Sequence, residues 1–116
     1  MTRRILVDGS VAVAHSGQLS ARGVSIERYD GQADDRQLIF TATERHALAV
    51  VVAGDAFLLA DELIEEAHRH HVTLVVTHTA NPLDAAALVA DHADDIIAYQ
   101  RGATVRLLAG GLRAVG

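Results

Sequence analysis

The 116-residue sequence has no cysteine, lysine or tryptophan and only one proline. Without cysteine there can be no disulfide, thiolate zinc site or cysteine nucleophile, which favours a cytoplasmic protein. Without lysine there is no P-loop lysine, Schiff-base lysine or lysine general base. We also find no apolar run of membrane-spanning length and no signal peptide, so no membrane segment is expected. Any chemistry is left to acidic groups, histidines, arginines and hydroxyls.

Half of the residues are hydrophobic but only 3% are aromatic, so the core is expected to consist of alanine, valine, leucine and isoleucine. The length predicts a single domain over residues 1–116. The net charge of −5 argues against a protein that coats nucleic acid non-specifically. An acidic-site nuclease remains compatible with this charge, because a bound metal ion would offset the local repulsion.

Strand-like and helix-like segments alternate along the chain. Such alternation predicts an α/β fold with right-handed crossovers, a three-layer sandwich around a central, mostly parallel sheet of about five strands. Continuous apolar runs indicate buried strands, and a 3.6-residue apolar period indicates helices. The predicted strands are residues 5–7, 24–29, 47–53, 72–77 and 96–99; the predicted helices are residues 11–22, 35–46, 57–71 and 83–91. Residues 104–115 fit either a short strand or a helix.

Four aspartates fall where a predicted strand meets a helix. Asp8 follows the first strand, Asp34 and Asp35 open the second helix, and Asp55 follows the third strand. The carboxyl ends of parallel strands converge on one crevice, where ligands bind in such folds. Carboxylates gathered there repel one another unless a cation lies between them. Asp34 also suits a plain helix N-cap. The spacing nevertheless favours a site for a hard divalent cation such as Mg²⁺ or Mn²⁺.

The same segments resemble the PIN/NYN group of nucleases. Residues 5–10 (Ile-Leu-Val-Asp-Gly-Ser) resemble its opening strand, residues 33–36 its acidic helix start, and residues 50–57 its strand running into Gly-Asp. Residues 88–97 resemble its closing helix and strand. Two positions depart from the pattern, since Val11 stands where asparagine is frequent and Ala56 where a second acid is frequent.

The resemblance implies a metal-dependent ribonuclease with a PIN-like or Rossmann-like fold. Mg²⁺ or Mn²⁺ would be held directly by three catalytic residues, namely Asp8, Asp35 and Asp55. Asp34 and Asp61 would hold the metal through water. RNA would be the substrate, and its phosphates would be contacted by Ser10, Arg36 and His78, with Arg22 and Arg28 as further candidates.

A second resemblance points to a different class of protein. Residues 35–52 followed by Leu58-Leu59, and residues 81–97, are similar to the Rossmann regulatory domains of potassium channels and transporters. This similarity implies a nucleotide-binding or regulatory module without catalysis. Asp30 would then face a ribose hydroxyl. The glycine-rich dinucleotide loop is missing, because Asp8 and Val11 stand within it. The sequence could also form a receiver domain, with Asp55 as phosphoacceptor and Thr77 as switch hydroxyl. Receiver domains need a lysine near the last strand, however, and this sequence contains no lysine. A homodimer or a regulatory protein partner is compatible with each interpretation.

Overall fold

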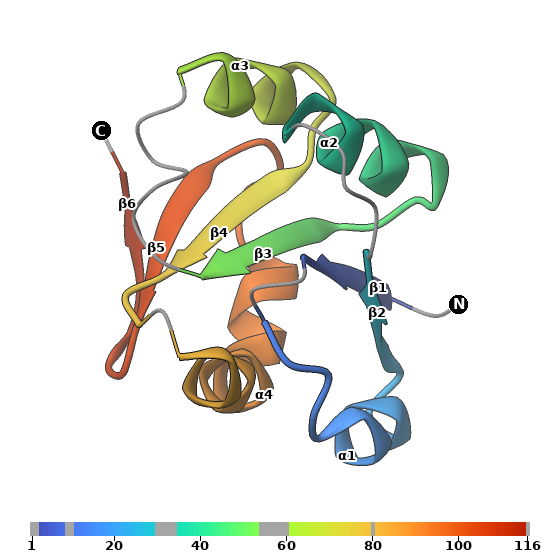
Figure 1. Cartoon of the computed structure of the whole chain (residues 1–116), viewed down its shortest axis with the longest axis vertical. Helices are drawn as coiled ribbons and strands as arrows, with labels where there is room; N and C mark the ends of the chain where they lie inside the picture. The colour runs from blue at the N-terminus through green and yellow to red at the C-terminus, as the bar shows by residue number, and fades with distance from the viewer. Residues whose placement is uncertain (1–2, 9–10, 30–34, 54–60, 80, 116) are drawn as a thin grey trace.

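The computed structural model describes residues 3–8, 11–29, 35–53, 61–79 and 81–115, without the side chains of Ser16, Asp35 and Arg36. Strands and helices alternate through most of this part of the chain (Figure 1). No helix within it combines the length and apolarity needed to cross a membrane. The elements are β1 (Arg3–Val7), α1 (Ser16–Ala21), β2 (Val24–Arg28), α2 (Asp35–Glu44), β3 (Ala49–Ala53), α3 (Asp61–Arg69), β4 (Thr73–Thr77), α4 (Pro82–Ala98), β5 (Thr104–Leu108) and β6 (Gly111–Ala114).

The strands form one six-stranded sheet in the order β2-β1-β3-β4-β5-β6. Strands β1 to β5 pair in parallel and β6 pairs antiparallel with β5. The predicted α/β class with a mostly parallel sheet is therefore confirmed, with six strands where about five were expected. In this order the direction of strand addition reverses between β1 and β3, which is the topological switch point of a doubly wound sheet.

The core is made of aliphatic side chains on both faces of the sheet. On one face, Ala49 and Val51 of β3 join residues of α1 and α4, including Leu19, Val89 and Ile96, in one buried cluster. On the other face, Val50 and Val52 join residues of α2 and α3, including Ile39 and Leu63. Figure 1 shows these two helix pairs on opposite sides of the sheet. Central strands buried on both faces explain the continuous apolar runs in the sequence.

The predicted strand over residues 96–99 is wrong, because α4 runs through to Ala98. Its buried residues recur at helical spacing, namely Ala85, Ala86, Val89, Ala93 and Ile96. Ile96 and Ile97 therefore extend the apolar stripe of a helix. The likeness of residues 88–97 to a closing helix and strand fails for the same reason.

The tail, left open between strand and helix, is a β-hairpin. Leu108 of β5 pairs with Gly111 of β6, so Ala109 and Gly110 form the connecting turn. Gly111 adopts a φ of 127°, which side chains disfavour and glycine permits. Along β5, buried Val105 and Leu107 alternate with the half-buried Arg106, the period of a strand with one face in the core.

The other elements fall within a few residues of the predictions. The first helix is shorter than the predicted 11–22, since α1 begins at Ser16 and Val11 packs into the core from the connection before it. Residues 57–60 of the predicted third helix lie outside the described part. At α4 the predicted start is accurate, because the Oδ1 of Asn81 accepts hydrogen bonds from the N–H groups of Leu83 and Asp84 at 3.0 and 3.1 Å.

Candidate functional site

The carboxyl edge of the sheet is defined by the ends of β1 and β3 at the switch point. After β1 the chain crosses one face of the sheet through α1 to reach β2, and after β3 it crosses the other face through α3 to reach β4. The crossover helices that follow the neighbouring strands β1 and β3 therefore lie on opposite faces of the sheet. Divergence of this kind opens the crevice in which doubly wound folds bind their ligands.

Asp8 lies at this carboxyl edge, directly after the last residue of β1. Its backbone N–H donates to the carbonyl oxygen of Val51 at 3.2 Å, and its own carbonyl accepts from the N–H of Val11 at 3.1 Å. These two bonds hold the Asp8 backbone beside β3 and turn the chain away toward α1. The residue is half-buried.

Two other candidate acids begin helices at the same edge. Asp35 is the first residue of α2 and Asp61 the first residue of α3. Each of these helices leads from the carboxyl end of one strand to the amino end of the next, so both helix starts lie at the carboxyl edge with Asp8. The Asp61 side chain is exposed. An acid in the first helical turn is also favoured by the helix dipole, independently of any metal.

Several predicted site residues lie outside the described residues, namely Ser10, Asp34, Asp55 and the side chains of Asp35 and Arg36. Asp30 and Ala56 lie outside them as well. Within the described residues, no group of three or more histidine, aspartate or glutamate side chains is placed to hold one metal ion. Since the predicted cluster needs Asp34, Asp35 and Asp55, the metal centre stays a prediction.

His78 lies at the carboxyl edge, one residue beyond β4. Its backbone N–H donates to the carbonyl oxygen of Leu107 at 3.0 Å, and its ring Nδ1 lies 3.3 Å from the same oxygen. A carbonyl only accepts hydrogen bonds, so this contact favours the tautomer with the proton on Nδ1. The ring is exposed. Two strand spacings separate β4 from β1, or about 10 Å, so His78 lies at the same edge of the sheet as Asp8 but two strands away from it.

Val11 and Thr77, two further residues named from the sequence, are both buried in the fold. Val11 is buried to 1% exposure in the cluster beneath α1 and α4, so the position that departs from the nuclease pattern has been absorbed into the core. Thr77 is fully buried, and its hydroxyl donates to the carbonyl oxygen of Thr79 at 2.7 Å. Its Oγ1 is therefore committed to the turn that follows β4.

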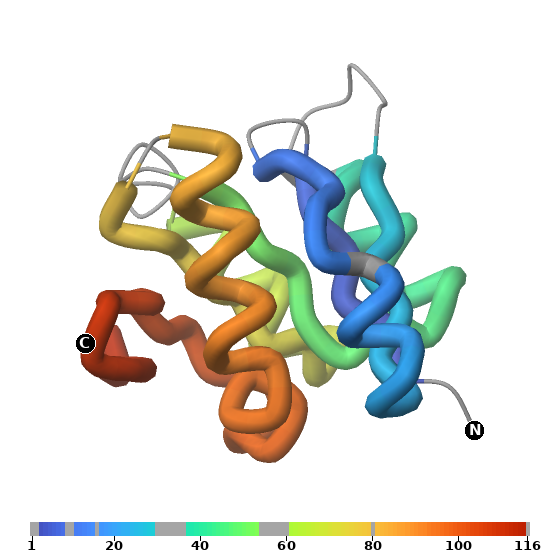
Figure 2. Tube along the Cα trace, turned by 90° about the horizontal axis from the view of Figure 1, so that it is seen from below, coloured from blue at the N-terminus to red at the C-terminus, as the bar shows by residue number. Residues whose placement is uncertain are grey.

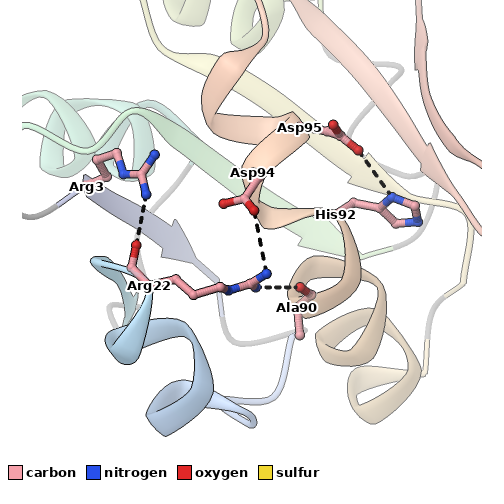
Figure 3. Close-up of polar contacts among 6 residues, drawn as sticks. All are labelled: Arg3, Arg22, Ala90, His92, Asp94 and Asp95. Carbon is pink, nitrogen blue, oxygen red and sulfur yellow. Dashed lines mark hydrogen bonds and ion pairs between the residues drawn. The ribbon is translucent and has the colours of Figure 1, made fainter.

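Arg22 lies at the end of α1 that leads into β2, at the amino edge of the sheet. Its guanidinium donates to the carbonyl oxygen of Ala90 at 3.1 Å and lies 3.6 Å from Asp94, while its own carbonyl accepts from Arg3 at 2.9 Å (Figure 3). His92 has non-helical backbone angles and marks a kink in α4 between these two partners. Arg22 thus links the end of α1 to α4 through a hydrogen bond and an ion pair. Both contacts lie at the amino edge of the sheet, away from the predicted site.

Sequence reasoning missed a groove between α1 and α4, which lie side by side on one face of the sheet (Figure 2). Its volume is about 460 Å³, and it is lined by His15, Gln18, Arg22, Ala87, Ala90 and Asp91. No motif marks it, because its residues come from two helices that are far apart in the chain. The groove is lined by a basic residue (Arg22), an acidic residue (Asp91) and two neutral polar residues. This mixture does not favour one class of ligand over another.

Comparisons of the chain with models of protein families, with curated proteins and with solved structures found no match.

Proposed function

We propose that the protein is a Mg²⁺- or Mn²⁺-dependent ribonuclease of the PIN/NYN type, built as a three-layer sandwich. The observation that supports this proposal most is the position of Asp8 at the switch point. Asp8 is half-buried directly after β1, and its backbone N–H donates a hydrogen bond to Val51 of β3. Doubly wound folds bind ligands at this position, and the helix starts at Asp35 and Asp61 share the edge.

The donor set fits a hard divalent cation. Asp8, Asp35 and Asp55 would hold it directly, and Asp34 and Asp61 through water, so all ligands are oxygen atoms. When bound, such an ion activates a water molecule and stabilises the charge that develops on a phosphate. The protein's own contribution is to hold the carboxylates at one edge. Ser10, Arg36 and His78 would orient the phosphate, since these residues follow or begin elements at that edge.

The nucleotide-binding alternative has less support. The strand order β2-β1-β3-β4-β5-β6 does not decide between the two functions, because doubly wound sheets of order 2-1-3-4-5 also bind a nucleotide at their switch point, but the glycine-rich first loop of dinucleotide-binding domains is missing. The first loop also carries Asp8 and the buried Val11 where a phosphate would need backbone N–H groups and glycines. A carboxylate at the end of β1 suits a cation better than an anionic pyrophosphate.

The experiment is a Mn²⁺ titration followed by thermal unfolding, with cleavage of a single-stranded RNA measured in parallel. Mn²⁺ at a hundred times its Kd should stabilise the native state by about 2.7 kcal/mol. Asp8→Asn and Asp55→Asn should lose this shift and the cleavage. Asp91→Asn is the matched control, because it removes one exposed aspartate from the middle of α4. Unchanged metal stabilisation and cleavage in Asp8→Asn would overturn the proposal.

A further inference from the structure

The helix α4 is interrupted at one residue in its second half. His92 has φ −117° and ψ 17°, outside the helical range, and so marks a kink between two helical segments. Kinks usually arise at proline, at glycine and serine pairs, or where a side chain or water enters the hydrogen-bond ladder. Residues 83–98 contain no proline, glycine or serine. No helix-breaking residue therefore accounts for the kink at His92.

The imidazole ring of His92 contacts oxygen atoms through both of its nitrogens. Nε2 lies 3.3 Å from the carbonyl oxygen of Ala109, in the turn between β5 and β6. Nδ1 lies 3.6 Å from Oδ2 of Asp95, one helical turn further along α4. The side chain of His92 is 17% exposed, so little of the ring reaches solvent. Figure 3 shows the ring and Asp95 pointing away from Arg22.

These two contacts differ in what they require of the ring. A carbonyl oxygen and an ionised carboxylate only accept hydrogen bonds. A neutral imidazole carries one N–H group, so it donates to one of the two oxygens and turns a lone pair toward the other. The imidazolium carries two N–H groups and donates to both. The arrangement around His92 is therefore complete only when the ring is protonated.

Asp95 is the charged group that faces the ring from α4. On the same helix, Asp94 is turned toward α1, where its carboxylate lies 3.6 Å from the guanidinium of Arg22. Asp91 lines the groove between α1 and α4. Strands β3 and β4, which pack against α4, contain no charged residue. The carboxylate of Asp95 therefore sets the charge on the helix side of the ring.

The hairpin faces the ring with a backbone carbonyl. Its apolar side chains pack toward α4. Arg106 and Arg113 alternate with these side chains along β5 and β6, so they project from the opposite face of the sheet. Within the described residues 104–115, the hairpin thus places no charged side chain beside His92. The contact with Ala109 joins the turn of an edge hairpin to the kink of the helix that packs against it.

We propose that His92 is a proton-dependent latch, which fastens the turn of the C-terminal hairpin to the kink in α4. When protonated, the ring donates to Ala109 and forms an ion pair with Asp95. Histidine titrates between about pH 5 and 8, and as the pH rises through this range the ring releases one proton to solvent. The attraction to Asp95 is then lost, and the hydrogen bond to Ala109 is no longer charge-assisted.

The sign of the effect follows from the strength of the two bonds. Charge-assisted hydrogen bonds are roughly twice as strong as neutral ones. The hairpin turn is therefore held more firmly below the titration range of histidine and more loosely above it. Because β6 pairs with β5 alone, loosening at the turn affects the hairpin before it affects the centre of the sheet.

The test is amide hydrogen exchange of the whole protein at about pH 5.5 and about pH 7.5, on either side of the histidine range. Protection is expressed relative to an unstructured chain at the same pH, since intrinsic exchange also depends on pH. Protection of the β6 amides should fall by about two- to fivefold at the higher pH, as expected for the loss of one partly exposed ionic contact. Amides of β3 should change less.

Two substitutions separate the ring from its partner. His92→Gln keeps a donor for the Ala109 carbonyl but removes the titrating group, so protection of β6 should no longer change with pH. Asp95→Asn removes the carboxylate and should reduce the pH-dependent change. Asp95 is 72% exposed, so this variant should fold even if His92→Gln does not. In the parent protein, protection of β6 should follow the titration of the His92 ring, measured by its nitrogen chemical shifts.

His78→Gln is the matched control. The His78 ring also contacts a carbonyl oxygen of β5, that of Leu107 at 3.3 Å, but no ion pair with an acid is found for it among the described residues. This variant should keep the full pH dependence of β6. The latch is overturned if protection of β6 is the same at both pH values in the parent protein. Unchanged pH dependence in both His92→Gln and Asp95→Asn, or its loss in His78→Gln, would also overturn it.

Discussion

The backbone N–H of Asp8 donates to the carbonyl oxygen of Val51 at 3.2 Å, just beyond the paired residues of β1 and β3. Val51 is fully buried in the centre of the sheet. The position of the Asp8 backbone is therefore set by a rigid strand, although the residue itself lies in a connection. Functional groups on loops that are anchored to a rigid scaffold are positioned more accurately than groups on free loops.

Under the proposed nuclease function, the acidic residues differ in their expected importance for cleavage. Asp8→Asn should reduce kcat for RNA cleavage by more than about 100-fold, since even residues that only support metal ligands cost 10–100-fold. Asp61→Asn, assigned to a water-mediated contact, should cost about 10-fold. The measurement is single-turnover cleavage in Mn²⁺, with thermal unfolding as a check that both variants are folded. A larger loss in Asp61→Asn than in Asp8→Asn would reverse the assigned roles.

The sheet was predictable because its central strands are buried on both sides. Runs such as Val50 to Val52 and Leu74 to Val76 have no polar face, and only a parallel sheet covered by helices buries such runs completely. The start of α4 was predictable too, since Asn81 and Pro82 are local signals of a helix N-terminus. In both cases the pattern is contained within a few consecutive residues.

The end of α4 and the hairpin were not predictable in this way. A short apolar pair such as Ile96 and Ile97 fits a strand or a helix, and only the spacing back to Val89 and Ala93 decides between them. The pairing of Arg106 with Arg113 depends on the register across the hairpin turn. At the site, the order of strands and helices in the sequence placed Asp8 and the helix starts at one edge of the sheet. Why position 11 carries a valine could be explained only by the structure, in which Val11 is buried in the core.

The helical state of residues 96–98 predicts different costs for two adjacent isoleucines. Ile96 is 1% exposed against the sheet, so Ile96→Ala should destabilise the protein by about 2–5 kcal/mol. Ile97 is only half-buried, and Ile97→Ala should cost less than about 2 kcal/mol. Chemical unfolding of both variants measures the difference. Equal losses would contradict the helical packing described for α4.

His71 ends α3 in a conformation that suits glycine. Its φ is 57°, its N–H donates to the carbonyl oxygen of His68 at 3.2 Å, and the N–H of Val72 donates to Ala67 at 2.9 Å. These bonds form a Schellman motif, in which the left-handed residue is usually glycine. His71→Gly should stabilise the protein by about 0.5–1 kcal/mol, since the strain removed exceeds the added chain entropy.

The neighbouring histidine provides the control for this substitution. His70 has no positive φ and its Nε2 lies 3.2 Å from Glu66, so His70→Gly should destabilise the protein. Thermal unfolding of the two glycine variants therefore gives shifts of opposite sign. A fall in the unfolding temperature of His71→Gly would show that the imidazole contributes more than the strain costs.

Arg22 should control the stability of α1 more than that of the sheet. The helix has six residues, and its N-cap residue His15 makes no side-chain capping bond, so α1 depends on contacts with the rest of the fold. Arg22 supplies two of these contacts, through Ala90 and Asp94 of α4. Its ion pair is partly exposed and is expected to contribute less than about 1 kcal/mol, with a similar amount from the hydrogen bond.

Arg22→Ala should therefore speed amide hydrogen exchange in α1 by about tenfold, which corresponds to about 1.4 kcal/mol of local opening free energy. Amides of β3 and β4 should change less, because they are held in the centre of the sheet. Arg101→Ala is the control, as an exposed arginine in the connection before β5. Equal acceleration in α1 and in the central strands would show that Arg22 stabilises the whole fold, and α1 would then not open independently of the sheet.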